Sequence, residues 1–285
     1  MMIVGAYVGF SKLLVAVFPV LLLAWLRFGI AAVAMSTWLK RSANEAPLDA
    51  RTRSLLFLES FIGNFLFSIC MLFGMQNATA ISAGIIMAGI PAAVALLSWL
   101  LLNERLTMRM IVAIALGAAG VSVLALSRGG QAEASTSILG TLLLVGAVFC
   151  EACYVVIGKR LTGNLSPKRI SALINLWGLA LVTPFGLYAA WSFDFASVTV
   201  TIWGGLVFYA LAASMWTVWL WMTGLKTVPA AKAGIFSVFL PITAALVGVF
   251  FLDETFTRLH ALAFVCALAG VVLATWPSAQ TPTAN

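Results

Sequence analysis

The hydrophobic positions of this chain fall into long runs separated by short polar connections. A run of about 20 apolar residues is the length that a helix needs to cross the hydrocarbon core of a bilayer. Only helices and closed barrels satisfy every backbone polar group in lipid, and barrel strands are shorter and alternate in polarity. We therefore predict an all-α integral membrane protein with ten transmembrane helices. The first predicted helix begins at residue 1, and the others cover about 19–39, 54–75, 80–102, 110–127, 138–158, 170–191, 200–223, 230–252 and 259–276.

One long stretch of the sequence occurs twice. Segment 74–124 aligns with segment 224–274 without a gap, at a constant offset of 150 residues. A weaker match upstream relates 6–14 to 153–161. Self-similarity on this scale indicates a duplicated half-protein rather than a solenoid of short repeats. We predict a first repeat at 1–127, a linker at 128–137, a second repeat at 138–276 and a disordered tail at 277–285.

Basic residues predict the orientation of the chain in the membrane. They gather in alternate connections, while the opposite connections hold essentially Arg128 and Arg258. Basic connections stay on the cytoplasmic side, so we expect an inner (plasma) membrane protein with both termini cytoplasmic. Each half has an odd number of helices, so the two repeats would lie in inverted orientation. The basic residues of the cytoplasmic set are Lys40, Arg41, Arg51, Arg53, Arg105, Arg109, Lys159, Arg160, Lys168, Arg169, Lys226 and Lys232.

Composition excludes several classes of function. With 63% hydrophobic and 9% charged residues, the chain could not cover a water-facing surface. The net charge of +7 is spread over the connections, which argues against a nucleic-acid partner. Cys150 and Cys153 have C-x-x-C spacing but no second pair, so we interpret them as packing residues and predict no metal site. The chain has no phosphate-binding loop and no H-E-x-x-H, G-x-S-x-G or paired intramembrane aspartates, so we expect no cofactor, no ATP coupling and no enzyme.

The duplicated motifs resemble those of a known transporter family. In each half a small-residue opening, a proline within the helix and an acidic helix end recur: Ala83-Gly84 or Ala233-Gly234, Pro91 or Pro241, and Asn103-Glu104-Arg105 or Asp253-Glu254-Thr255. In these features the chain is similar to the ten-span EamA-type members of the drug/metabolite transporter superfamily. The resemblance implies a pathway formed by predicted helices 1–4 and 6–9, with helices 5 and 10 peripheral. Similar proteins export amino acids, drugs and other metabolites, or import solutes.

The first predicted helix departs from that family. It is about ten residues shorter than its partner in the second half, and it lacks the tryptophan-glycine pair usual there. We therefore expect that the natural chain begins upstream of Met1.

Glu151 is the deepest predicted intramembrane charge. It precedes Lys159 by eight residues, which is roughly 12 Å along a helix. A charge at this depth costs a few kcal/mol and needs a partner or a function. Glu151 is therefore a candidate for binding a substrate amine or exchanging a proton. The alternative is a structural hydrogen bond to a neighbouring helix, for example at Asn175.

Other ionisable residues have simpler interpretations. For Arg27 three interpretations are open: its side chain reaches the membrane surface, pairs with a carboxylate or attracts an anionic group. Glu59, near a helix end, is expected to pair with a basic residue of the adjacent loop. Glu104 and Glu254 recur at helix ends, which favours capping or loop closure over a coupling role.

Uncharged polar and aromatic residues add candidates for a pathway between the halves. Trp216 and Trp219 share a helix face at i, i+3, where they would line the pathway or lie at the lipid interface. Hydrogen-bonding side chains recur in corresponding helices of the two halves. These further candidates are Asn64, Ser68, Tyr154 and Asn175.

Glycines and prolines suggest where helices bend. Gly84 and Gly234 permit close helix approach, while Pro91 and Pro241 each leave a carbonyl without its usual partner and favour a kink. We expect these helices to bend about a central site, although static packing explains the same residues.

Together the sequence predicts a secondary transporter in the lipid bilayer that moves a small organic substrate, an amino acid or related compound, outward by alternating access. Efflux of multiple drugs or lipophilic cations is the alternative, favoured if Glu151 faces a cavity with Trp216 and Trp219. An intramembrane enzyme is the third hypothesis.

Overall fold

The computed structural model of the protein describes residues 2–41, 45, 48–102, 108–126, 137–162, 165–227 and 239–275. Within these residues the chain is all-helical. Short 3-10 helices are η1 (Ser36–Leu39) and η4 (Phe195–Ser197), and π-helical segments are η2 (Phe61–Leu66) and η5 (Ala212–Trp216). The α-helices are α1 (Met2–Val15), α2 (Val20–Ala34), α3 (Ala50–Ser60), α4 (Phe67–Gln76), α5 (Ala80–Met87), α6 (Ile90–Leu102), α7 (Met108–Leu126), α8 (Ile138–Leu161), α9 (Pro167–Trp191), α10 (Val200–Leu211), α11 (Thr217–Thr227), α13 (Phe239–Phe251) and α14 (Arg258–Thr275).

Every predicted apolar segment contains an apolar helix, but their lengths differ. In the described part, four helices are long and apolar enough to cross a membrane: Ala50–Gln76, Ile138–Lys159, Pro167–Trp191 and Val200–Gly224. Six other apolar helices have 10–17 residues. The first helix, expected to be short, has 14 residues in α1, whereas the second, expected over about 19–39, is divided into α2, with 15 residues, and η1. Helix α1 ends because the chain turns before Pro19, and helix α2 ends where the 3-10 helix η1 begins.

Local capping explains two boundaries that differ from the prediction. The third predicted helix was expected from residue 54, but α3 begins at Ala50 because the Asp49 carboxylate accepts a hydrogen bond from the Thr52 backbone N–H at 2.8 Å. The seventh was expected from residue 170, but α9 begins at Pro167, whose missing N–H costs nothing in the first turn. The predicted linker and tail lie outside the described residues, apart from Ser137, which caps α8.

Two long helices contain π-helical turns at corresponding places. Segment η2 joins α3 to α4, and η5 joins α10 to α11. Moving η2 by the repeat offset of 150 residues gives 211–216, which overlaps η5. A π turn inserts one residue into the helix and rotates the face that follows by about 100° relative to an uninterrupted α-helix. Such turns are frequent at functional sites.

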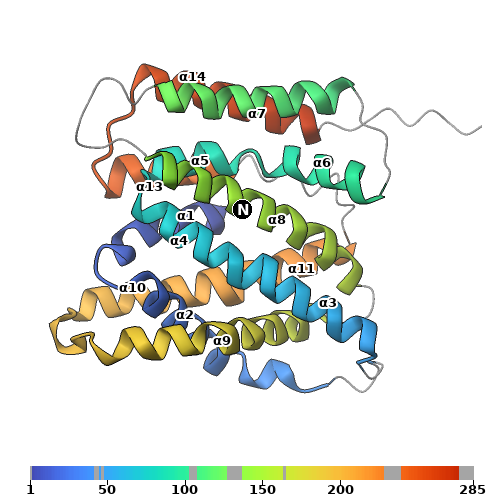
Figure 1. Cartoon of the computed structure of the whole chain (residues 1–285), viewed down its shortest axis with the longest axis vertical. Helices are drawn as coiled ribbons and strands as arrows, with labels where there is room; N and C mark the ends of the chain where they lie inside the picture. Colours follow the sequence, from blue (N-terminus) through green and yellow to red (C-terminus); the bar gives the residue numbers. More distant parts are fainter. Residues whose placement is uncertain are drawn as a thin grey trace, which may run out of the picture.

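Helices α7 and α14 form a separate pair at one edge of the molecule, at the top of Figure 1. A Cβ on Gly120 would lie 3.1 Å from the Ala263 carbonyl oxygen, and a Cβ on Gly270 would lie 3.1 Å from the Ala113 carbonyl oxygen. The later residue of α7, Gly120, contacts the earlier part of α14, whereas the earlier residue Ala113 contacts the later Gly270. The two helices are therefore antiparallel, and their glycines allow close backbone approach.

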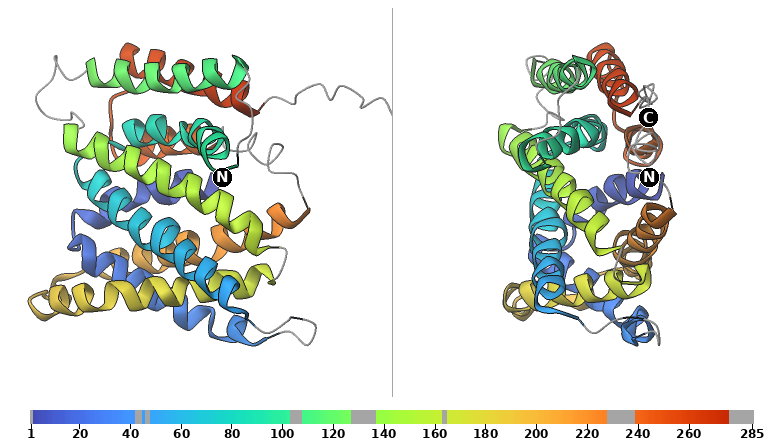
Figure 2. Two further views of the ribbon diagram at one scale, coloured as in Figure 1. Left: turned by 45° about the vertical axis from the view of Figure 1, so that its right-hand side comes forward. Right: turned by 90° about the vertical axis from the view of Figure 1, so that its right-hand side faces the viewer.

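The remaining helices surround the centre of the molecule. In the right-hand view of Figure 2, α4 and α8 lie on one side, α1 and α11 on the other, and α9 at the lower end. Contacts between α4 and α8, α2 and α9, and α1 and α13 link segments that are distant in the sequence. The buried core consists mainly of aliphatic residues, alanine and a few aromatic rings.

Candidate functional site

A cavity of about 250 Å³ lies between these helices. Its walls come from both halves of the chain, including both π-helical segments, and none of its lining residues belongs to α7 or α14. Roughly two-thirds of the lining residues are hydrophobic or glycine, which is typical of small-molecule sites. The lining residues are Ile3, Val4, Tyr7, Arg27, Gly63, Asn64, Phe67, Glu151, Tyr154, Ile174, Ala213, Thr217, Val218, Leu220, Trp221 and Gly224.

Arg27, on α2, is the cation of this cavity. Its side chain is 3% exposed, and its guanidinium lies 4.2 Å from the centroid of the Phe28 ring. One guanidinium nitrogen donates a hydrogen bond to the Ser68 hydroxyl, which in turn donates to the Asn64 carbonyl oxygen. Arg27 Nε has no hydrogen-bond partner among the described residues. The side chain is thus held in place from one side and keeps a donor for another group.

Glu151, on α8, is the acidic group of the same cavity. No described residue forms a hydrogen bond or an ion pair with its carboxylate, and the amide of Asn175, named as the alternative partner, donates to Phe28 instead. Tyr7 also lines the cavity and lies within electrostatic range of both Glu151 and Arg27. Arg27 and Glu151 therefore line one cavity without pairing with each other.

Three uncharged polar groups complete the lining. The Tyr154 hydroxyl, the Thr217 hydroxyl and the Trp221 indole N–H are buried without a hydrogen-bond partner in the described part of the chain. Buried polar atoms are normally hydrogen-bonded, so these groups have free hydrogen-bonding capacity at the wall of the cavity. Gly63, in η2, brings this wall together, since a Cβ there would lie 2.6 Å from the Tyr154 Cβ.

Asn64, Ser68 and Asn175 have different roles from one another. Asn64 lines the cavity and donates from its amide to the Ile174 carbonyl oxygen at 3.2 Å. Ser68 does not line it and instead holds Arg27. Asn175 is 1% exposed, and its amide donates to the Phe28 carbonyl oxygen at 2.9 Å, joining α9 to α2. The latter two are therefore structural supports of the site.

Trp216 and Trp219, expected either along the pathway or at the lipid interface, are not among the residues that line this cavity. Trp216 packs against Phe208, and the ring centroid of Trp219 lies 5.8 Å from that of Trp38. Trp221, further along the same helix, lines the cavity.

Two acidic residues also depart from expectation. Glu59 pairs with no basic loop residue: it is fully buried, and neither carboxylate oxygen has a hydrogen-bond partner among the described residues. Glu254 has the expected helix-end role, but the helix that it caps is in the other half. Its two oxygens accept from the backbone N–H groups of Ala80 at 2.7 Å and Ile81 at 3.0 Å.

Of the expected bending positions, Pro91 lies next to a helix break. The fourth predicted helix divides into α5 and α6, with turn residues at 88–89 immediately before α6, which contains Pro91. Gly84 lies against the second half, where a Cβ would be 2.9 Å from the Ala244 Cβ and 3.3 Å from Pro241. Gly234 lies outside the described residues.

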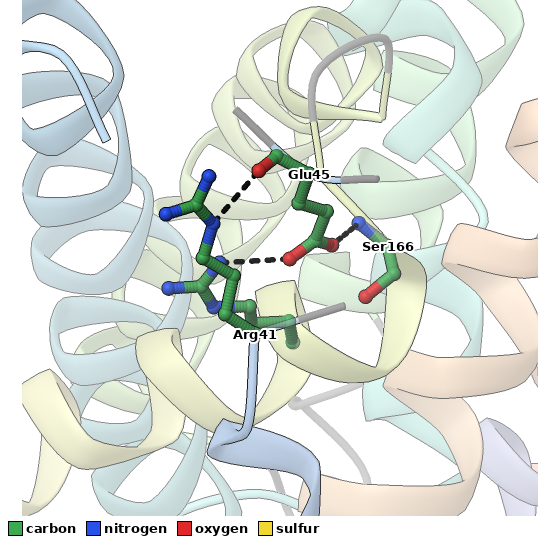
Figure 3. Close-up of polar contacts among 4 residues, drawn as sticks. Arg41, Glu45 and Ser166 are labelled. Atoms are coloured by element: carbon green, nitrogen blue, oxygen red, sulfur yellow. Dashed lines mark hydrogen bonds and ion pairs between the residues drawn. The ribbon is translucent and has the colours of Figure 1, made fainter. Parts of the chain in front are cut away.

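A polar clasp holds the connection before α3 against the start of α9 (Figure 3). The Glu45 carboxylate accepts from the Ser166 backbone N–H at 2.6 Å and from the Arg169 guanidinium at 2.7 Å, while Arg41 donates to the Glu45 carbonyl oxygen at 2.7 Å. Burial by itself raises the pKa of Glu45, but the hydrogen bonds from Arg169 and Ser166 outweigh it and lower the pKa to about 2. The clasp lies in a loop and outside the cavity.

The described chain, with its many apolar helices around a cavity that holds a few polar groups, has the features of a multi-pass membrane protein. The EamA-like transporter family matches residues 1–126 and 138–276, and the chain belongs to this family, within the drug/metabolite transporter superfamily.

Known relatives agree with this assignment. The uncharacterized transporter YetK of Bacillus subtilis (strain 168) is 34% identical over 273 residues, covering 95% of this chain and 83% of the relative. The uncharacterized transporter YyaM of the same organism is 23% identical over 247 residues, covering 85% and 80%. A solved structure titled "Crystal structure of protein" has the same fold, with a TM-score of 0.63 and 20% identity over 96% of this chain and 94% of that one.

Proposed function

We propose that this transporter moves a small zwitterionic metabolite, an amino acid or a related compound, out of the cell by alternating access. The observation that carries the proposal is the presence of Arg27 and Glu151 in one cavity without an ion pair between them. A guanidinium binds a carboxylate through its fork of N–H donors, and a carboxylate binds an ammonium group through charge-assisted hydrogen bonds. A substrate with both charges would bind the guanidinium through its carboxylate and the glutamate through its ammonium group.

The size and lining of the cavity support the same substrate class. Its volume of about 250 Å³ is below the roughly 300–1,000 Å³ of drug-sized pockets. Tyr154, Thr217 and Trp221 supply uncharged hydrogen-bonding groups beside apolar surface, which suits an amphipathic molecule. Efflux of lipophilic cations has less support, because Trp216 and Trp219 lie outside the cavity and Arg27 would repel a purely cationic drug.

Alternating access is proposed on the basis of the repeat. The antiparallel pairing of α7 with α14, with its reciprocal glycine contacts, is what a two-fold relation between inverted halves would produce. The π turns of η2 and η5, at corresponding places, each contribute a wall of the cavity through Gly63 and Ala213. The inner-membrane location and cytoplasmic termini remain part of the proposal and rest on the basic connections.

The test uses the full chain reconstituted in liposomes, with amino acids presented as zwitterions, as cationic methyl esters and as anionic N-acetyl derivatives. Each measurement is made with and without a pH gradient. We expect the wild type to transport the zwitterion best. Arg27→Gln should lose preference for the free carboxylate and accept the ester comparatively well. Glu151→Gln should lose preference for the free amine and accept the N-acetyl derivative comparatively well.

A matched control is Asp194→Asn, which changes a charge in an exposed loop and keeps an oxygen that accepts from the Ala196 backbone N–H. This variant should transport all three forms as the wild type does. Equal transport of the three forms by the wild type would contradict the proposal. Preference for lipophilic cations over all amino acids would replace it with drug efflux.

A further inference from the structure

Glu59 is a carboxyl group without a partner in the interior of the protein. It lies on α3, two residues before the π segment η2, and its exposure is 0%. Neither of its oxygens has a hydrogen-bond partner among the residues described. It is not one of the cavity-lining residues, so a transported molecule that occupies the cavity would not reach it.

Among the described residues, none forms an ion pair or a hydrogen bond with Glu59 that could balance a negative charge. A Cβ on Gly158 of α8 would lie 2.8 Å from Glu59 Oε1, and 2.9 Å from the Met222 methyl of α11. The described titratable groups within electrostatic range of Glu59 include Cys153, Tyr154 and Glu151, all on α8.

The basic residues nearest to the centre of the protein are engaged elsewhere. Arg27 donates to Ser68, and Lys12 donates to the carbonyl oxygens of Met75, at 3.1 Å, and Ala78. The ion pair between Arg169 and Glu45 does not include Glu59.

The electrostatic cost of burial therefore decides the protonation state of the Glu59 side chain. An ionised carboxylate without a partner costs several kcal/mol in a protein interior, whereas the neutral acid has only the smaller cost of an unpaired polar group. The packing of α3 against α8 and α11 around Glu59 is thus compatible with the protonated acid.

We propose that Glu59 is a proton-binding site, distinct from the substrate cavity, and that its occupancy is coupled to the closing of α3 against α8. When the two helices part, water reaches the carboxyl group and it releases its proton. When they close, the carboxylate must first take up one proton from water, forming the neutral acid. The inference rests on the helix motion that the proposed transport cycle requires, and it makes that cycle proton-coupled whatever the charge of the substrate.

Tyr154 gives this site a connection to the cavity. On α8, Glu151, Tyr154 and Gly158 share one face at i, i+3 and i+7, and opposite them Glu59 and Gly63 share one face at i, i+4. The Tyr154 hydroxyl lines the cavity, is unpaired, and lies in the electrostatic range of both carboxyl groups.

The first experiment identifies the protonated acid directly, by infrared spectroscopy of the purified full chain in detergent at neutral pH. We expect a carbonyl band of a protonated carboxyl group that disappears in Glu59→Gln and persists in Glu151→Gln. Glutamine has nearly the shape of the neutral acid, so the variant should fold. Absence of the band from the wild type, or its persistence in Glu59→Gln, would overturn the proposal.

The second experiment measures the coupling to helix motion through Cys153, which lies on α8 beside Glu59. The other three free cysteines, Cys70, Cys150 and Cys266, are replaced by alanine. A water-soluble maleimide is the probe, and each rate is divided by that of the unfolded protein at the same pH.

The corrected labelling rate should rise several-fold from mildly acidic to alkaline pH in the parent and in Glu59→Asp, and should stay flat in Glu59→Gln. Equal pH dependence with glutamine would overturn the proposal. So would the absence of labelling at every pH, because α3 and α8 would then not part. Neither experiment uses a transported compound, so the outcome is independent of the substrate proposed above.

Discussion

Removing the carboxylate of Glu254 should weaken the contact between the two halves of the transporter. The first turn of α5 has four backbone N–H groups without partners in its own helix. Two of them, at Ala80 and Ile81, donate to Glu254. The Ser82 N–H donates to the Thr79 hydroxyl, and the Ala83 N–H makes the first intrahelical bond, to the Thr79 carbonyl oxygen. Of the three donors at 80–82, two therefore depend on one side chain of the opposite half.

The expected magnitude follows from these contacts. A hydrogen bond to a charged group contributes about 1.5–3 kcal/mol, and a carboxylate at a helix N-terminus gains about 0.3–1 kcal/mol from the helix dipole. Because Glu254 is partly exposed and water can replace some of this, we expect Glu254→Ala to destabilise the protein by about 2–4 kcal/mol. Glu254→Gln should lose about half as much, since one amide oxygen can still accept.

The assay is thermal unfolding in detergent, followed by tryptophan fluorescence. At about 2–4 °C per kcal/mol for a chain of this order of size, Glu254→Ala should lower the Tm by roughly 5–10 °C. Asp253→Asn is the matched control: this neighbour is exposed and has a φ of 51°, a conformation that asparagine tolerates. A Tm for Glu254→Ala within about 1 °C of the control would refute the reasoning, because the donors of α5 would then be equally well satisfied by water.

Three further predictions concern separate parts of the structure. Glu45→Gln should lower the free energy of unfolding by about 1–2 kcal/mol at neutral pH. The pKa of the native carboxyl group is lowered from 4.5 to about 2, so the difference in stability between wild type and variant should shrink as the pH falls through that range. Thermal unfolding at a series of pH values measures this difference. Gly186→Ala should destabilise by about 1–3 kcal/mol, because its Cβ would lie 2.3 Å from a tryptophan side chain, whereas Gly204→Ala meets nothing within 4 Å and should be neutral in the same melts. Trp221→Phe should raise the KM for transport several-fold, while Trp219→Phe, outside the cavity, should leave it unchanged in liposome uptake.

Prediction from sequence was most successful where the signal is local. Each apolar run became an apolar helix, because the free energy of placing a segment in lipid depends mainly on its own side chains. Arg27 and Glu151 stood out for the same reason, since a charge within an apolar run is costly wherever it faces. Both line the cavity.

Prediction failed where a side chain's role depends on distant segments. The sequence could not show that Trp221 lines the cavity while the neighbouring Trp216 and Trp219 do not. Glu59 lies close enough in sequence to a basic loop to suggest an ion pair. The packing of α3 against α8 instead buries it without a hydrogen-bond partner among the described residues.

The sequence by itself determined that this chain is a helical membrane protein and predicted a duplicated half, because the length of apolar runs and self-similarity can both be read directly from the order of residues. Only the tertiary structure decided which side chains meet: Arg27 with Glu151 around one cavity, and Glu254 with the start of α5 in the other half. The physical reason is that hydrogen bonds and electrostatic interactions act over a few ångströms in space. The residues that they join here are separated by more than a hundred positions in the chain.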